Sequence, residues 1–188
     1  MTIFTTTVAA SADDAQELAG TNTTNGANLN ANAASHLIGL RFTGVTVPAG
    51  STINAAYLTV NITSGSYDDP DVTIRGGNEA DPAAFTTAAN HLTDRSKTAA
   101  SVAWSASNVG TGSRNTPDLS TLVTAIIGLG GWASGNAMAF YITGSGSSAL
   151  RFTAYDNGSS YPSLTIDYTA PSAGGQPRRT VHQFRLRS

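Results

Sequence analysis

The longest stretch of β character in the chain runs from residue 53 to residue 63, INAAYLTVNIT. Apolar residues alternate there with polar or aromatic ones, and this period of two is typical of a strand with one buried and one exposed face. Because a turn signal at residues 48–50, PAG, comes just before it, residues 37–62 are predicted to form a strand, a turn and a second strand. The core of a β-sandwich is expected to grow around this segment.

Seven short runs of apolar and β-branched residues predict strands. They lie at residues 3–8, 36–42, 72–75, 101–104, 137–143, 150–155 and 163–168. Residues 11–35 are too polar for a core, so we expect an irregular surface excursion there with one short strand near residues 27–29. Residues 90–100 are also expected to be irregular, and Phe85 is expected to anchor the loop before them in the core.

One helix is predicted, over residues 117–127. Thr116 is positioned to cap it, Pro117 suits the first helical position, and Asp118 favours the positive N-terminal end. Apolar residues then recur at helical spacing until Gly128 ends the pattern. The predicted fold is all-β: an antiparallel, jelly-roll-like β-sandwich with this short helix capping one open end and with an extended C-terminal tail.

The chain has 188 residues, which is enough for one domain with a sizeable core, and it contains no cysteine. Disulfides, thiolate zinc sites and cysteine nucleophiles are therefore excluded. No apolar run is long enough to cross a bilayer, and residues 1–14 show no secretory signal.

Charge divides the chain into two parts. Residues 1–169, the predicted sandwich domain, hold six basic and twelve acidic residues, a net charge of −6, whereas residues 178–188 hold four arginines and no acidic residue. Residues 170–177, APSAGGQP, have the composition of a linker. The segment 178–188 alternates apolar and polar residues, so it is predicted to be a basic attachment tail that adds a strand to, or lies across, another surface. The residues expected to contact the partner are Arg178, Arg179, Phe184, Arg185 and Leu186.

Three motifs are similar to a known domain. RFTGVTVPAG at residues 41–50, TPDLS at residues 116–120 and YPSLTIDYT at residues 161–169 resemble the DNRLRE-type domain family in the same order. Members of that family are β-sandwich modules of bacterial surface proteins and bacteriophage virion proteins. The resemblance covers most of residues 3–169 and implies a non-catalytic module, but the motifs are structural and transfer no site residues. The missing secretory signal and the basic tail favour a phage particle protein over a cell-surface protein.

We therefore expect a structural virion protein of the capsid-decoration or head-fibre type, assembled in the host cytoplasm and attached through its tail. Its expected partners are other virion proteins, such as the major capsid protein or neighbouring copies in a homo-oligomer, and not a membrane. Four charges on a short arm beside an acidic body argue against nucleic acid. The alternative is an extracellular carbohydrate-binding module of a phage adhesin or secreted protein, in which exposed tyrosines bind a host glycan. The candidate tyrosines are Tyr57, Tyr67, Tyr141, Tyr155 and Tyr161.

No residue pattern typical of catalysis is present in the sequence. His36, His91 and His182 lie far apart, and there is no nucleophile elbow or phosphate-binding loop, so no catalytic residue and no enzymatic activity are expected. A glycoside hydrolase would need two carboxylates facing each other across a sugar cleft, together with lining aromatic residues, which are few here.

Clustered carboxylates on loops can hold Ca²⁺. Asp13, Asp14 and Glu17 are weak candidates for such a site, and residues 68–71, DDPD, form a second acidic cluster. Neither has the spacing of a Ca²⁺-binding loop, so carboxylates that cap solvated turns are the favoured interpretation and no cofactor is expected.

Overall fold

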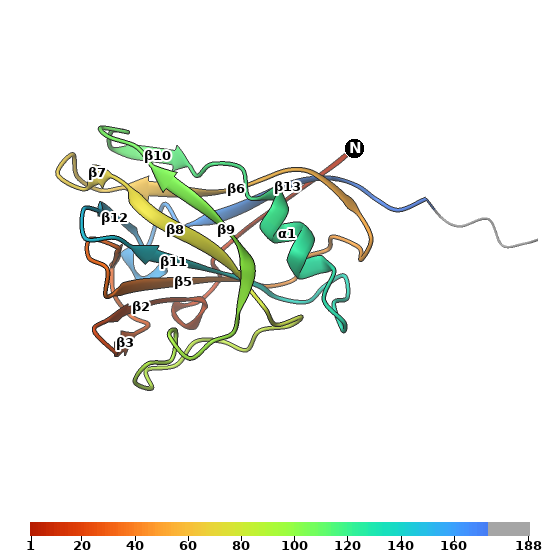
Figure 1. The fold of residues 1–188 in the computed structure, drawn as a ribbon, viewed down its shortest axis with the longest axis horizontal. Helices are drawn as coiled ribbons and strands as arrows, with labels where there is room; N and C mark the ends of the chain where they lie inside the picture. The colour runs from red at the N-terminus through yellow and green to blue at the C-terminus, as the bar shows by residue number, and fades with distance from the viewer. Residues whose placement is uncertain (173–188) are drawn as a thin grey trace, which may run out of the picture.

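The computed structural model describes residues 1–172, which form two antiparallel sheets packed as a sandwich with one short helix at their side (Figure 1). Sheet A contains β1 (Thr2–Thr7), β13 (Ser163–Thr169), β6 (Thr52–Ile62), β12 (Ala149–Thr153) and β4 (Asn28–Asn30), with β10 (Gly112–Asn115) beside β6 and β7 (Asp68–Asp69) beside β12. Sheet B contains, in order, β3 (Thr21–Thr23), β2 (Asp14–Leu18), β5 (His36–Phe42), β11 (Met138–Gly144), β8 (Asp71–Gly77) and β9 (Lys97–Ser105). The helix is α1 (Ser120–Ile127), and two 3₁₀ turns lie at Ser11–Asp13 and Tyr155–Asn157. The predicted antiparallel β-sandwich is confirmed.

Strand β6 has the central place in sheet A that its length and alternation predict. It pairs with β13 along most of its length and with β10 on its other side. Leu58, Val60 and Ile62 are all buried, as the period of two requires. The turn before β6 is closed by the Ser51 N–H, which donates to the Pro48 carbonyl at 3.2 Å. Because β5 and β6 lie in different sheets, this strand–turn–strand unit crosses the sandwich and does not form a hairpin.

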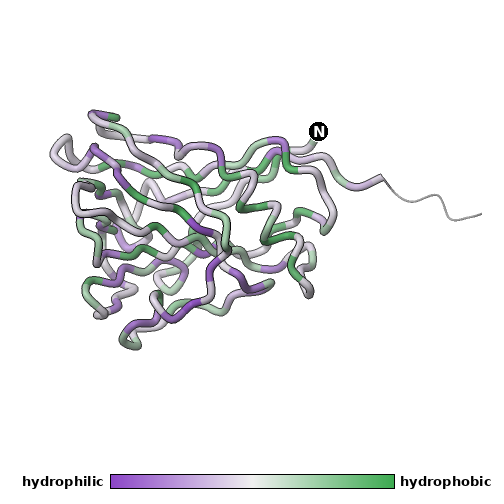
Figure 2. Tube along the Cα trace, in the orientation of Figure 1, coloured by the Kyte–Doolittle hydropathy of each residue, from purple (hydrophilic) through white to green (hydrophobic). Residues whose placement is uncertain are grey.

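The main core fills the space between the sheets. Figure 2 shows apolar positions recurring along the strands and through α1, with polar positions between them. The largest side chains that are fully buried there come from both sheets and from the residue just before α1: Phe42, Phe140, Phe152, Leu29, Ile38, Leu40, Leu58, Ile62, Ile74 and Leu119. Helix α1 contacts β6 of sheet A and both β8 and β9 of sheet B, so it closes one open side of the sandwich as expected.

The predicted start of the helix is wrong by three residues, because α1 begins at Ser120. Thr116 and Asp118 instead bond to the backbone of β6. The Leu58 N–H donates to Thr116 Oγ1 at 3.1 Å, and the Ala56 N–H donates to Asp118 Oδ1 at 2.9 Å. Beyond the end of β10, this side of β6 has backbone donors with no strand partner, and the two side chains satisfy them. The helix ends at the glycines that were predicted to stop it.

The polar stretch at residues 11–35 is more ordered than predicted. It contains β2, β3 and β4, and β2 lies inside sheet B between β3 and β5. Asp14 and Glu17 of β2 are buried, which a polarity argument alone does not anticipate, because it ignores the partners that a carboxylate finds within the fold. Strand β9 likewise begins at Lys97, within the stretch 90–100 that was predicted to be irregular.

A second, smaller hydrophobic cluster lies outside the sandwich, on the outer face of sheet B. Phe85 and Leu92 of the loop at residues 78–96 are buried there against β2, β5 and β11, so the predicted anchor at Phe85 is confirmed, although it enters this cluster and not the main core. The loop needs a glycine beneath it, because a Cβ on Gly39 would lie 2.7 Å from Phe85 Cζ. Close packing of this loop therefore fixes the identity of residue 39.

Candidate functional site

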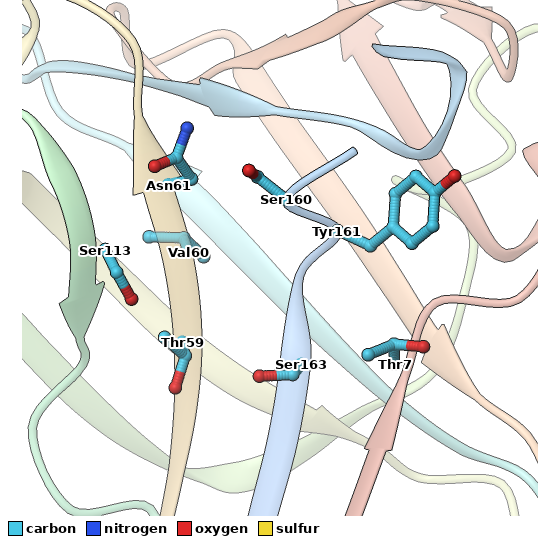
Figure 3. A pocket seen from close by; sticks show the side chains of 8 residues that line it. All are labelled: Thr7, Thr59, Val60, Asn61, Ser113, Ser160, Tyr161 and Ser163. Atoms are coloured by element: carbon cyan, nitrogen blue, oxygen red, sulfur yellow. The ribbon is translucent and has the colours of Figure 1, made fainter. Parts of the chain in front are cut away.

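An open hollow of about 270 Å³ lies on the outer face of sheet A (Figure 3). Its lining comes from β1, β6, β10, β13 and the segment leading into β13, and it is almost entirely made of hydroxyl and amide groups. The lining residues are Thr7, Thr59, Val60, Asn61, Ser113, Ser160, Tyr161 and Ser163. None of them carries a charge at neutral pH, so the hollow can offer hydrogen bonds to a ligand but no carboxylate or imidazole for acid–base chemistry.

Strand register assembles this polar face from distant parts of the chain. Thr59 lies directly between Ser163 and Asn115, its partners on the two neighbouring strands. Thr59 Oγ1 donates to Asn115 Oδ1 at 2.9 Å, and the hydroxyls of Thr5 and Thr165 lie 3.3 Å apart on β1 and β13. Alternation places all of these side chains on the face away from the core. We call the face formed by Thr5, Thr7, Thr59, Asn61, Ser113, Asn115, Ser163 and Thr165 the hydroxyl face. The sequence shows that each strand has a polar side, but the register that joins them is not readable from it.

The five candidate tyrosines do not form one platform. Tyr155 and Tyr161 stack, with ring centroids 4.9 Å apart and planes at 28°, and Tyr161 belongs to the lining of the hollow. Tyr141 is buried in the cluster on sheet B, and Tyr67 lies beneath the guanidinium of Arg151, 4.2 Å from Cζ to the ring centroid. Tyr57 is half-buried on β6, opposite Thr165 and on the same face as Thr59, but it does not line the hollow. Of the five tyrosines, only Tyr161 lines the hollow.

The three weak Ca²⁺ candidates are each engaged with a different part of the fold. Asp13 forms an ion pair with Arg41, and Asp14 Oδ2 accepts the Tyr155 N–H at 2.7 Å. Glu17 accepts the backbone N–H groups of the loop at residues 92 and 93, at 2.8 and 3.2 Å. Asp14 and Glu17 are three residues apart on β2, an odd spacing that directs them to opposite faces of the sheet. Within residues 1–172, no group of three or more histidine, aspartate or glutamate side chains is placed to hold a metal ion.

Burial gives Asp14 an unusual titration. Loss of solvent raises the pKa of this carboxyl from 3.8 to about 7, against the opposing effect of the Tyr155 N–H. The negative charges of Asp156 and Asp13 nearby raise the pKa further. A titratable group at neutral pH is a common feature of active sites. Here, however, the carboxyl is 1% exposed and no other titratable group of the described chain is hydrogen-bonded to it, so we assign it to the structure of the fold.

Carboxylates of the second acidic cluster, residues 68–71, also accept hydrogen bonds from loops. Asp68 Oδ2 accepts the Gly110 N–H at 3.1 Å, and the hydroxyls of Ser145 and Ser147 donate to Asp71 Oδ2 at 2.5 and 2.9 Å. The bond from Ser145, with that from Ser147 next, holds the pKa of Asp71 below its ordinary value. These carboxylates cap turns, in agreement with the favoured interpretation of the sequence.

The described histidines lie apart from the hollow. His91 Nδ1 is 3.2 Å from Thr86 Oγ1 and its Nε2 is 3.2 Å from an Arg95 nitrogen, in the loop that covers sheet B. Burial, with the positive charge of Arg95 next, lowers the pKa of His91. His36 is the first residue of β5, in sheet B. Neither imidazole has a carboxylate partner among the hydrogen bonds of residues 1–172.

The predicted attachment residues Arg178, Arg179, Phe184, Arg185 and Leu186 lie outside the described residues, as does most of the predicted linker at residues 170–177. In the part of the chain that is described, no helix combines the length and apolar character needed to span a membrane. Comparison of the sequence with protein-family models and with curated proteins found no match.

Proposed function

We propose that this chain is a non-enzymatic structural protein of a bacteriophage virion, of the capsid-decoration or head-fibre type, attached to the particle through residues 178–188. The observation that carries the proposal is the use of the carboxylates. Those that are buried in the described chain accept backbone N–H groups of loops or pair with an arginine, which leaves them unavailable for acid–base or metal chemistry. A sandwich fastened in this way is suited to rigid display of a surface.

The charge distribution supports attachment through the C-terminal segment. The sandwich carries a net charge of −6, and the segment at residues 178–188 carries four arginines. A cationic strip of this kind attracts an acidic surface, on the major capsid protein or on the body of a neighbouring copy. The resemblance to modules of virion proteins, carried by the motifs at residues 41–50 and 161–169, points the same way.

Removal of residues 171–188 tests the attachment. Particles lacking this protein are incubated with the full chain or with the truncated chain, and the bound copies are counted after sedimentation. We expect the truncated chain to bind at least ten times more weakly. Unchanged occupancy of the particle would refute the anchoring role.

A matched pair of full-length variants separates the arginine charges of this segment from its uncharged side chains. Replacing Arg178, Arg179 and Arg185 together by glutamine should weaken attachment and reduce its dependence on salt, because three charges that bind an acidic surface are removed. The control variant carries Thr180→Ala and Gln183→Ala, which leave all four arginines in place. Equal attachment by the two variants would show that the arginines do not bind the particle.

A second candidate function, recognition of a host glycan, is favoured by the hydroxyl- and amide-lined hollow beside the stacked Tyr155 and Tyr161. Flat sugar faces pack on aromatic rings while their hydroxyls bond to polar side chains. Saturable binding on a glycan panel that is lost in Tyr161→Ala and Asn61→Ala, but kept in Tyr67→Ala, would support this function. No binding across a broad panel would count against it.

A further inference from the structure

The first strand of the chain ends sheet A with an unprotected edge. β1 pairs with β13 in regular register over six residues, from Thr2 with Tyr168 to Thr7 with Ser163, and with no other strand of residues 1–172. Native proteins protect such edges with charges, proline, bulges or very short strands. β1, with the sequence TIFTTT, has none of these features.

The other strands that pair on one side only are protected. β3, β4, β7 and β10 are two to four residues long. β9 has nine residues, but its pairing with β8 shifts register between Arg75 and Gly77, it begins with a lysine, and α1 packs against it. β1 is therefore the long, regular and uncharged edge of the described chain.

Exposed apolar surface gathers on the same strand. Ile3 is 66% exposed and Met1 is 87% exposed, and these two are the exposed large hydrophobic residues of the described chain. The side chain of Phe4 lies on the opposite face of β1, toward the main core, and is only partly buried there. An added strand would cover Ile3 on one face and complete the burial of Phe4 on the other.

Backbone geometry shows which groups of β1 are free. The Val8 N–H donates to the Pro162 carbonyl at 3.0 Å, toward β13. Backbone groups alternate in direction along an antiparallel strand, so every second residue before Val8 also bonds toward β13. The N–H and C=O groups of Ile3, Thr5 and Thr7 consequently point to the open edge. This is a row of three donors and three acceptors with no strand beside it in the described part of the chain.

We propose that β1 is a homodimer interface, in which the β1 strands of two copies pair antiparallel about a two-fold axis at Thr5. With this centre, Thr5 faces the second copy's Thr5, and Ile3 faces the second copy's Thr7. All of these are residues whose backbone groups point outward, so about six backbone hydrogen bonds form and no outward group is left unpaired. A centre at Phe4 or Thr6 would form only two such pairs within β1, and it would leave Thr7 or Ile3 of each copy opposite a residue outside the strand.

Charge and symmetry favour a second copy over a foreign strand. β1 is uncharged, and the nearest carboxylate of sheet A, Asp167, is paired with Ile3 near one end of the seam. From strand spacing and rise, it would lie about 20 Å from the second copy's Asp167, which is beyond the screening length of about 8 Å at physiological salt. The pairing is also closed, because each copy uses the one long, regular and uncharged edge of residues 1–172 and the joined sheet does not extend further.

A cysteine scan of β1 tests the interface and its register, since the chain has no cysteine of its own. Thr5→Cys places the two thiols on opposite residues of a hydrogen-bonded pair, about 5.5 Å apart at Cα, which suits a disulfide. Thr7→Cys is the matched control, because the two substituted positions would be separated by about 14 Å along the seam. Under mild oxidation, we expect at least ten times more covalent dimer from Thr5→Cys. Equal cross-linking of the two variants, or none from either, would overturn the interface.

Sedimentation of the full chain without a cysteine gives a second measurement. Thr5→Lys places two like charges opposite each other and should raise the dimer dissociation constant at least ten-fold. Thr165→Lys loses the same hydroxyl contact between Thr5 and Thr165 but lies one strand away from the seam, so it should leave association unchanged. A wild-type chain that stays monomeric up to millimolar concentration would overturn the proposal, with circular dichroism confirming that both variants are folded. Loss of the dimer on removal of residues 171–188 would assign the edge to that segment instead.

Discussion

Asp14 is predicted to make the fold less stable as the pH rises from acid to neutral. Its pKa in the folded chain is raised to about 7 by burial, whereas the unfolded chain loses this proton near 3.8. Between these two values the folded state binds more protons than the unfolded state, so the free energy of unfolding falls as pH increases. Above about pH 7 both states are ionised and the whole penalty is present.

The size of the effect follows from the same two pKa values. The gap between 3.8 and about 7 corresponds to a loss of at most about 4 kcal/mol of stability at alkaline pH. Asp14→Asn keeps an oxygen that can accept the Tyr155 N–H but has no charge to bury. We therefore expect this variant to match the wild type near pH 4 and to be more stable near pH 8. For a domain of this size, the full difference is a rise in Tm of about 8–16 °C.

Thermal or urea unfolding of both chains across this pH range is the assay. The wild-type profile also contains His91, whose lowered pKa makes stability rise with pH below its ordinary value of 6.5. The difference between variant and wild type at each pH removes that contribution. Asp94→Asn, an exposed carboxylate in the loop over sheet B, is the control and should change stability by less than about 0.5 kcal/mol. If the profiles of Asp14→Asn and the wild type stay parallel from pH 4 to about pH 8, Asp14 does not carry a buried charge.

Three further substitutions, two of them with a comparison variant, test how the loops and the helix are held. Gly39→Ala should cost about 1–3 kcal/mol, because the new Cβ would lie 2.7 Å from Phe85 Cζ, whereas Gly65→Ala, where the Cβ meets open space, should be nearly neutral in urea unfolding. Glu17→Ala should lower the free energy of unfolding by about 1–3 kcal/mol for each N–H that it leaves unpaired at Leu92 and Thr93. Hydrogen exchange of this variant should show the loop at residues 78–96 opening first. Strong protection of that loop from exchange would contradict this role. Asp118→Ala should lower stability by about 1–3 kcal/mol by orphaning the Ala56 N–H, and Asp118→Asn, which retains the acceptor, should recover most of it in the same melt.

Hydrophobic periodicity predicts the features that are local to a single strand: its place in the sequence and which of its faces is buried. β5 was placed at residues 36–42 and is found at His36–Phe42, and the buried side of β6 was correct at Leu58, Val60 and Ile62. The remaining predicted strands lie within two residues of the observed ones, apart from β9, which starts earlier than predicted. Alternation succeeds because the burial of every second side chain is a local consequence of strand geometry.

Features that depend on a distant partner were not predictable. β2 was missed because Asp14 and Glu17 find their partners at Tyr155 and Leu92, far away in sequence. Thr116 and Asp118 are residue types that favour the start of a helix. Their side chains instead accept hydrogen bonds from backbone N–H groups of β6 that have no strand partner, so the helix begins later. The hydroxyl face was missed for a related reason, since strand register decides which polar rows lie side by side.

Salt separates the two attachments that we infer. The segment at residues 178–188 would bind through arginines, and pairing of exposed charges weakens as salt shortens the screening length from about 10 Å at 0.1 M to about 3 Å at 1 M. The β1 seam joins uncharged residues through backbone hydrogen bonds and apolar contact at Ile3, so added salt should leave it intact. A particle-bound protein with both would be released by salt as a dimer. The opposite outcome is release as a monomer, with Thr5→Cys chains cross-linking only while they are bound to the particle. That outcome would mean that the particle, and not pairing of the β1 strands, brings the two copies together.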